Sequence, residues 1–544
     1  MKNIFYIIIS FLAFITINSC EDHLDSVPFS FVSPDNFYKS AGEAEIGLNG
    51  VYSILTAGSV QNFGNASGYR RGLMFMLNGA TDEAILRNNF NNITFSVWGN
   101  ASFTSESELI NENWFFFYAG INRANILIDR LQNINDFTDN RKIEIEAEAR
   151  VLRGFYHMIL SMMHGGIPVY NTPIHDPNQE RQTIEAVYEQ ILSDFEFGYQ
   201  NLQARGLRES SINKFTAAGL LVKAHSYLAS FKKTGSVSFQ DLEINSFDWV
   251  DADDHYRKAL DYTTEIVNQS GYELIPEYDN LFRETTKSFQ YRECLFTAEA
   301  STDAAQNVIT VLVNGFIPQG NMNVTGGGFG WYRPTSELWN KYTDGDIRFK
   351  HNLTGNLPPS SAQEIVDGVN YYIPREIQSP NTGLYCIGKY RMMDPKEKVV
   401  APFASATSLP LLRYADILLL RAEAQFFLGD EPSARNTLTT LRQRAVSTTI
   451  SVQNLNLAYA KPDFLEELLD ERSRELCFEN WRRIDLARFH KYDETIQNLS
   501  ETDGFYNVRT APIIRNNWRP ERIWIPIPLQ QRDLNQNLIQ NNGY

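Results

Sequence analysis

The sequence predicts a mostly α-helical protein in which helical hairpins form a scaffold beside a more irregular, loop-rich part. Long segments with apolar residues at helical spacing fill much of the first half of the chain and return after residue 408. Between about 271 and 408, turns, short apolar alternations and many aromatic residues replace that periodicity. We therefore expect one helical assembly whose irregular segments lie at its surface.

Composition sets limits on what this protein binds. The 544 residues are 43% hydrophobic and 13% aromatic, which suffices for a packed core. The net charge is −16, with 49 basic against 65 acidic residues and no basic stripe. Nucleic acids and anionic lipid surfaces are therefore not expected partners.

The first residues resemble an export signal. An apolar run follows Lys2 and spans residues 4–17, which as a helix reaches roughly 21 Å, short of a hydrocarbon core of roughly 30 Å. A signal peptide over 1–19 is favoured over a membrane span, and a small residue before Cys20 predicts lipidation at Cys20. Secretion with a free Cys20 is the alternative. Of the remaining cysteines, Cys294, Cys386 and Cys477, at most two can pair, so no disulfide framework is predicted.

Successive helices are predicted after a tether over residues 20–40. The first begins at about Ala41, and the next span residues 107–131, 141–164, 184–202, 213–231 and 253–268. Small residues in the segment 213–231 allow close helix contact. These helices form a predicted N-terminal helical part over residues 41–270.

Residues 69–104 lose helical periodicity and turn to Asn, Gly, Ser and aromatic residues. Polar amides beside a tryptophan in an irregular segment suit a surface loop that holds a neutral polar ligand. Trp98 and Asn100 are the main candidates here, and Arg71 and Arg87 are further ones.

The segment 271–408 is the predicted variable, ligand-facing part. Its sequence GGGFGWY lacks the Lys-Ser or Lys-Thr that completes a phosphate-binding loop. The glycines instead allow a turn that projects Trp331 and Tyr332 outward as ligand contacts.

No residue pattern predicts a cofactor, and structural calcium is left open. His157 and His164 lie seven residues apart on one helix face, a spacing that permits a metal site. Without a third ligand nearby, we interpret both as packing residues.

The C-terminal part, residues 409–544, begins with a helix predicted over 411–428, then one to residue 445 and a third over 464–489. Arg413, Asp416 and Glu423 lie on one side of the first and need partners of opposite charge, because an unpaired buried charge is costly. The third helix supplies both signs, including Arg472 and Glu475. We interpret these five residues as a structural ion-pair network, rather than a catalytic carboxylate site, which would lie in an open cleft.

The segments RYADILLLRAEA, TLRQRA and DERSRELCFENWRRIDLARF resemble, in order and spacing, the C-terminal hallmarks of the SusD/RagB family of outer-membrane nutrient-binding lipoproteins. EAEARVLRGFYHMILSMMHGGIPVY is similar to another hallmark, and Asn480 stands where the family usually has glycine. Pro334, Thr335 and Leu338 resemble the family's Pro-Thr-x-x-Leu helix start, which implies that Trp339 lies in the core. The resemblance implies a SusD-like fold with tetratricopeptide-like helical hairpins.

The resemblance also implies a role. A SusD-like protein is anchored in the outer membrane by its N-terminal lipid, faces the cell exterior, and binds an oligosaccharide or polysaccharide without catalysis. It delivers this glycan ligand to a partner SusC-like TonB-dependent transporter. Peptide cargo is one alternative, and a surface glycoside hydrolase with two carboxylates about 5 to 10 Å apart across a cleft is another.

Overall fold

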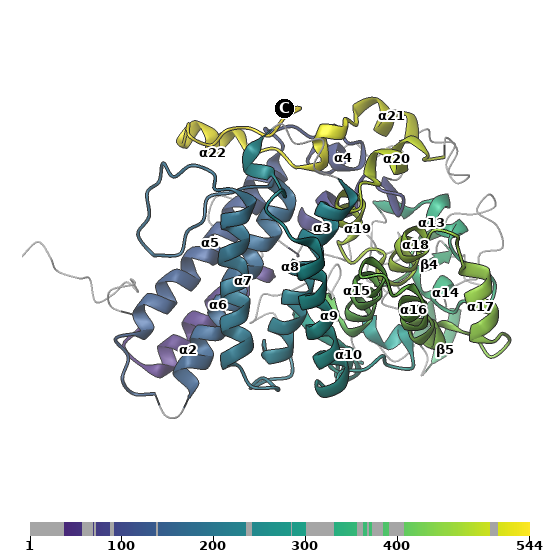
Figure 1. Ribbon diagram of the computed structural model, residues 1–544, viewed down its shortest axis with the longest axis horizontal. Helices are drawn as coiled ribbons and strands as arrows, with labels where there is room; N and C mark the ends of the chain where they lie inside the picture. The colour runs from purple at the N-terminus through teal and green to yellow at the C-terminus, as the bar shows by residue number, and fades with distance from the viewer. Residues whose placement is uncertain are drawn as a thin grey trace, which may run out of the picture.

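Helices make up most of the residues that the structure describes, and the long ones pack side by side (Figure 1). The computed structural model describes residues 37–56, 69, 72–86, 92–137, 140–235, 242–283, 286–300, 331–355, 363–366, 369–372, 385–390, 407–500 and 510–544. The predicted lipidation residue Cys20 lies outside these residues, as do Arg71 and Arg87.

The long helices form one stack in which each contacts the next along the chain. In order they are α2 (Ala41–Tyr52), α5 (Glu108–Leu131), α6 (Arg141–His164), α7 (Ile184–Asn201), α8 (Lys214–Thr234) and α9 (Ala252–Gln269). The hairpin of α15 (Tyr414–Phe427) and α16 (Glu431–Ala445) continues the stack by packing on α9, although about 145 residues separate them in sequence (Figure 1). The prediction of a mostly α-helical scaffold of hairpins is confirmed.

Local sequence signals set the helix ends. Ser40 caps α2 with a capping box, in which its side chain accepts from the Glu43 N–H and the Glu43 carboxylate accepts from the backbone of Ser40. Asp430 caps α16 by accepting from the Ser433 N–H. Gly429, at φ 90°, supplies the left-handed residue that separates α15 from α16.

The first C-terminal helix begins later than predicted, because residues 409–413 form a strand. This strand, β8 (Leu409–Arg413), pairs antiparallel with β2 (Cys294–Ala298), and every residue in both is buried. Apolar periodicity alone does not separate a fully buried strand from a buried helix, which is why the sequence prediction was wrong here. Arg413 is therefore the last residue of a strand.

The predicted helix over 464–489 is two helices, α18 (Phe464–Leu476) and α19 (Arg482–Arg488). Phe478 and Asn480 between them have φ values of 64° and 69°. Because left-handed residues interrupt a right-handed helix, the chain turns here. Asparagine adopts this conformation more readily than most residues, which accounts for Asn480 at a position where a glycine was the expected residue.

The segment 69–104 is more ordered than an irregular loop. It contains α3 (Gly72–Asn78), β1 (Ala84–Leu86) and α4 (Ile93–Gly99), and all of α3 and β1 is buried. The prediction of a surface loop over the whole segment is wrong, because short buried elements of this kind are too brief to show a period.

The smaller elements complete the fold. The helices are α10 (Lys287–Glu293), α13 (Ser336–Asn340), α14 (Arg348–Asn352), α17 (Val452–Tyr459), α20 (Tyr492–Gln497), α21 (Thr510–Asn517), α22 (Leu529–Leu534), η2 (Ser53–Leu55), η5 (Glu243–Asn245), η6 (Tyr278–Phe282) and η8 (Pro520–Ile523). Within the described ranges, β1 pairs with β3 (Tyr332–Pro334), β4 (Leu353–Gly355) with β7 (Tyr385–Ile387), and β5 (Gln363–Val366) with β6 (Val369–Tyr372), all antiparallel.

The core joins the helical stack to the β2–β8 pair. A Cβ on Gly219 of α8 would lie 2.6 Å from Leu412 Cδ2 and 3.2 Å from Leu295 Cδ2, so glycine is what allows α8 to approach the two strands. One cluster of buried apolar residues extends from Ala44 to Leu538. The predicted N-terminal, variable and C-terminal parts all contribute side chains to it, so they fold around a shared core.

Candidate functional site

The β1–β3 pair brings together the two segments that carry the predicted ligand contacts. Leu86 pairs with Tyr332 and Ala84 with Pro334, although almost 250 residues separate the strands. The Thr335 N–H donates to the carbonyl of Glu83 (3.2 Å) and extends this pairing toward α13. The aromatic residues around both strands therefore share one region.

Four rings form what we call the aromatic cluster: Phe75, Phe95, Trp331 and Tyr332. Trp331 stacks on Phe95 with ring centroids 5.3 Å apart and an interplanar angle of 27°, and Phe95 lies 4.4 Å from Phe75. Phe75 and Tyr332 are 5.1 Å apart. Only Trp331 is half-buried, and the other three rings are buried. Of these four rings, Trp331 is therefore the one with surface open to solvent, and its role as a ligand contact stays a prediction.

The structure contradicts two predicted ligand contacts. Tyr332 is fully buried, and its hydroxyl donates to the carbonyl of Phe75 (3.2 Å). Trp98 is 1% exposed and stacks on Phe103, with centroids 4.6 Å apart and an interplanar angle of 12°. Both predictions are wrong because successive strand residues point to opposite faces, and because α4 turns Trp98 inward. A direct contact with a ligand in solvent is closed to both side chains.

Asn100 remains half-buried at the end of α4, where its N–H donates to the Ser96 carbonyl (3.0 Å). Its own carbonyl accepts from Asn517 Nδ2 (3.0 Å). Ile93, at the start of the same helix, is 75% exposed. Asn100 is therefore placed for a ligand contact near α4, and this role stays a prediction.

The five residues of the predicted ion-pair network all form buried ion pairs. Asp416 Oδ1 accepts from Arg472 Nη1 (2.9 Å), and Glu423 accepts from both terminal nitrogens of Arg488 (2.6 and 2.8 Å). Arg413 Nη1 lies 3.0 Å from Glu475 Oε1. Every one of these side chains is at least nine-tenths buried.

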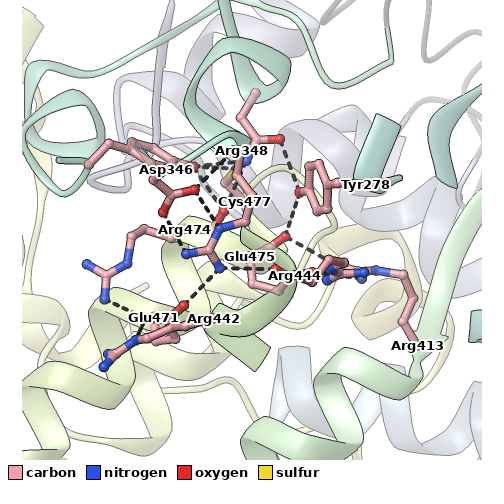
Figure 2. A network of polar contacts seen from close by, with 12 residues as sticks. Tyr278, Asp346, Arg348, Arg413, Arg442, Arg444, Glu471, Arg474, Glu475 and Cys477 are labelled. Atoms are coloured by element: carbon pink, nitrogen blue, oxygen red, sulfur yellow. Dashed lines mark hydrogen bonds and ion pairs between the residues drawn. The ribbon is translucent and has the colours of Figure 1, made fainter. Parts of the chain in front are cut away.

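The network continues to residues that the sequence did not single out. Arg348 binds Asp346 (2.7 Å), Glu471 (2.8 Å) and Glu475 (3.1 Å) at once, so it joins the segment before α14 to α18 (Figure 2). Arg444 of α16 also pairs with Glu475 (Figure 2). Cations thus surround the carboxylates on several sides.

This electrostatic environment is unsuited to a general acid. Burial raises the pKa of Glu475, but the guanidinium groups of Arg444, Arg413 and Arg348 outweigh it and hold the pKa well below its usual range. The pKa of Glu471 is likewise lowered: burial opposes ionisation, and Arg474, Arg442 and Arg348 favour it more strongly. Both groups remain ionised at neutral pH, as structural ion pairs require.

The two histidines considered as metal ligands are fully buried, and burial is the main reason that each pKa is lowered to about 3. In the part of the chain that the structure describes, no group of three or more His, Cys, Asp or Glu residues is placed to hold a metal ion. A pair that the sequence did not reveal is His225 on α8 and His255 on α9, whose Nδ1 atoms are 2.8 Å apart.

Cys294 and Cys477 are free and buried. The side chain of Cys386 lies outside the described residues, so these two cysteines at least are not paired with each other. No helix among the described residues is both long enough and apolar enough to cross a bilayer.

Trp339, which the sequence assigned to the core, packs against the core and also borders a cavity. Trp339 is half-buried and, with Tyr342 and Phe349, lines a cavity of about 610 Å³. The sequence held a signal for it, since the polar, glycine-containing run Thr343-Asp344-Gly345 follows the tryptophan directly.

Comparison with known proteins identifies the family to which this fold belongs. A sequence profile described as "SusD family" matches residues 292–544, and one described as "Starch-binding associating with outer membrane" matches residues 61–225. The chain belongs to the SusD family. A SusD-like protein of Formosa agariphila is 22% identical over 99% of both chains.

Solved structures of other SusD-family members share the fold. A SusD homolog from Bacteroides thetaiotaomicron superposes with a TM-score of 0.73 at 20% identity, covering 94% of this chain and 98% of the other. A surface glycan-binding protein A from Bacteroides thetaiotaomicron, in complex with laminarihexaose, has a TM-score of 0.67 at 20% identity and covers 92% and 100%. The predicted SusD-like fold is therefore confirmed.

Proposed function

We propose that this SusD-family protein binds an oligosaccharide or polysaccharide and delivers it unaltered to a partner TonB-dependent transporter. The observation that carries the binding step is the half-buried Trp331 ring, which directly precedes β3 and is held by its stack on Phe95. Sugar rings present flat C–H faces that pack on aromatic rings, while nearby amides bind hydroxyl groups. Half-buried Asn100 supplies such an amide.

The relatives support a glycan as the ligand. One family description reads starch-binding, and one protein of the same fold is a surface glycan-binding protein in complex with laminarihexaose. Identities near 20% leave the kind of glycan open, since ligand contacts lie in loops that vary most among homologues.

Delivery and location form the finer part of the proposal. We propose that lipid on Cys20 anchors the protein in the outer membrane with its folded part outside the cell. The stack from α2 to α16 offers the extended surface with which helical-repeat proteins contact other proteins. This surface is our candidate for the transporter contact.

The proposal includes no catalysis. Asp82 and Glu83 are neighbouring carboxyl groups whose pKa values are shifted in opposite directions, as those of a catalytic acid and base are. Burial and the nearby Asp82 raise the pKa of Glu83 to about 7 despite Arg482, while Arg482 and Lys341 hold the pKa of Asp82 below its usual range against burial. Glu83 is only 2% exposed, however, and accepts from Ser473 Oγ (2.8 Å) and the Phe478 N–H (3.3 Å). A carboxyl sealed in this way does not reach a glycosidic oxygen.

Affinity electrophoresis of residues 21–544 in gels containing different polysaccharides tests the binding step. At least one glycan should retard the wild-type protein, and Trp331→Ala should reduce the retardation. Trp249→Ala is the matched control, because Trp249 is also half-buried but lies in the α8–α9 connection.

If the glycan retards Trp331→Ala as strongly as it retards the wild-type protein, the aromatic cluster is not the glycan-binding site. Retardation by no glycan, with binding to peptides instead, would favour peptide cargo. If incubation with the protein shortens the glycan, the protein is a glycoside hydrolase and the proposed binding function is wrong.

A further inference from the structure

A cavity with aromatic lining lies in the C-terminal half, between the segment 339–350 and the segment 447–449. Its volume is about 610 Å³. Small-molecule sites typically measure about 300 to 1,000 Å³, so this cavity is large enough for a ligand. The aromatic cluster contributes no residue to it.

Three half-buried rings line this cavity: Trp339 at the end of α13, Tyr342 just after it, and Phe349 in α14. Trp339 and Phe349 pack edge to face, with centroids 4.6 Å apart and an interplanar angle of 86°. Phe349 and Tyr342 are 5.5 Å apart. Each ring is thus held by another while part of its surface faces the cavity.

Hydrogen bonds beneath the rings fix their positions. The Tyr342 hydroxyl donates to the carbonyl of Arg474 (2.9 Å) and accepts from Asn352 Nδ2 (2.9 Å). Asp346, which also lines the cavity, is buried and binds Arg348 (2.7 Å; Figure 2). It also accepts a hydrogen bond from the Tyr459 hydroxyl (2.8 Å). The buried ion-pair network therefore forms a rigid floor for the cavity.

Backbone hydrogen bonds join the two walls. The Ile347 N–H donates to the carbonyl of Ala445, and the Ser447 N–H donates to the carbonyl of Gly345, both at 2.9 Å. A cavity whose walls are already joined loses little conformational entropy when a ligand binds.

The rim carries polar groups suited to hydroxyls. Asp344, Lys350 and Thr449 are exposed and line the cavity. Within the described part of the chain, neither Asp344 nor Lys350 forms an ion pair with another residue, so a carboxylate acceptor and an ammonium donor remain open to a ligand. Aromatic faces bordered by a few polar groups are the chemistry that a sugar ring requires.

We propose that this cavity is a second glycan-binding site, which holds another part of the same chain that contacts Trp331. The inference rests on the proposed function, because it takes a glycan as the ligand. Trp331 and Trp339 are eight residues apart, so their Cα atoms lie at most about 28 Å from each other. A polysaccharide longer than this reaches both sites.

A sugar fits this cavity better than a peptide does. Peptides are commonly recognised by pairing with an exposed strand edge or by a groove that accepts a helix. The walls here are α13, α14 and two connecting segments, and none of the lining residues belongs to a strand. The cavity therefore offers no strand edge to a peptide backbone, and its side chains make the contacts with the ligand, as they do when proteins bind sugar rings.

The test compares variants of residues 21–544 on a polysaccharide that retards the wild-type protein and on a short oligosaccharide of the same glycan. Trp339→Ala should raise the Kd for the polysaccharide about three- to tenfold, the range set by loss of one stacked ring, and Trp339→Phe should restore most of it. Asp344→Ala should weaken binding in the same direction. Because Asp344 is exposed, this variant keeps the test valid even if Trp339→Ala unfolds.

Phe289→Ala is the matched control, since Phe289 is 39% exposed and lies outside the cavity. The loss should be larger for the polysaccharide than for the short oligosaccharide, because only the long chain gains from two linked sites. If Trp339→Ala is folded and both it and Asp344→Ala bind the polysaccharide with wild-type affinity, the proposed second site is wrong.

The outcomes separate the two proposals. If Trp331→Ala weakens glycan binding while the Trp339 and Asp344 variants bind normally, the proposed function stands and the second site fails. If no glycan retards the wild-type protein, the proposed function fails and the second site fails with it. An effect of Trp339→Ala on peptide binding alone would also overturn the inference.

Discussion

The ion pair between Glu423 and Arg488 offers a direct test of what the buried charges contribute. It links α15 to α19 through two parallel hydrogen bonds of 2.6 and 2.8 Å, and Arg488 Nε also donates to Asp485 (2.9 Å). Glu423 is 0% exposed and Arg488 3%. The prediction concerns Arg488→Met, which removes the cation and keeps much of the side-chain volume.

The structure sets the size of the effect. After Arg488→Met, the only hydrogen-bond partner left to Glu423 among the described contacts is the Tyr256 hydroxyl, at 3.2 Å. Asp485 keeps Arg472 (2.8 Å). Leaving one buried charge without its partner costs about 3 to 5 kcal/mol, whereas replacing a buried pair by apolar groups of similar volume is often close to neutral. We therefore expect Arg488→Met to cost about 3 to 5 kcal/mol and Glu423→Leu/Arg488→Met to cost much less.

Urea unfolding of residues 21–544, followed by circular dichroism, measures the free energies. The surface pair of Lys258 and Asp254 is the control, because both residues are about half exposed and Lys258→Met should change stability by less than about 1 kcal/mol. A double variant that loses as much as the two single variants summed would refute the reasoning, because the coupling energy would then be zero. So would an Arg488→Met variant no less stable than the surface control.

Three further predictions use the same assay. Gly219→Val should cost about 1 to 3 kcal/mol by overpacking α8, whereas Gly50→Ala, with no atom near its added Cβ, should stabilise by up to about 1 kcal/mol. Asn480→Ala should be about 1 kcal/mol less stable than Asn480→Gly, because both lose the 2.6 Å bond from Asn78 Nδ2 but only alanine is strained at φ 69°. Burial lowers the pKa of His157 from 6.5 to about 3. Between these two pH values the unfolded chain is protonated at His157 and the folded protein is not, so the free energy of unfolding should fall as the pH drops from 6.5 to about 3. The His157→Leu variant should lose less stability over this range.

The long helices could be predicted from the sequence because each carries its own period and its own cap. The helix predicted over 141–164 begins and ends at those residues in the structure, and that predicted over 184–202 ends one residue earlier, at Asn201. Errors arose where tertiary contacts decide the conformation. The segment 409–413, apolar except for Arg413, becomes a strand only because β2 lies beside it, more than 100 residues away in sequence.

The ligand site was less predictable for a related reason. Loop composition pointed to two segments that the structure brings together, since the segment 69–104 and the segment after residue 330 meet through β1 and β3. It did not tell which ring faces solvent, because that depends on strand register. With Leu86 opposite Tyr332, the Tyr332 ring turns inward to Phe75 and the neighbouring Trp331 is left at the surface.

The buried charged residues, unlike the ligand contacts, could be predicted from the sequence, but their link to a cavity could not. Charges on a buried helix face need partners of opposite charge, and this can be inferred from the spacing within one helix. The structure shows such a partner for each of them. What spacing could not show is that Asp346 and Arg348 carry the network to the floor of a cavity lined by Trp339 and Phe349. Because Arg348 connects that floor to α18 through Glu471 and Glu475, charges that stabilise the helical scaffold also hold the rings in place. Stability of the scaffold and the geometry of the cavity are therefore properties of the same side chains.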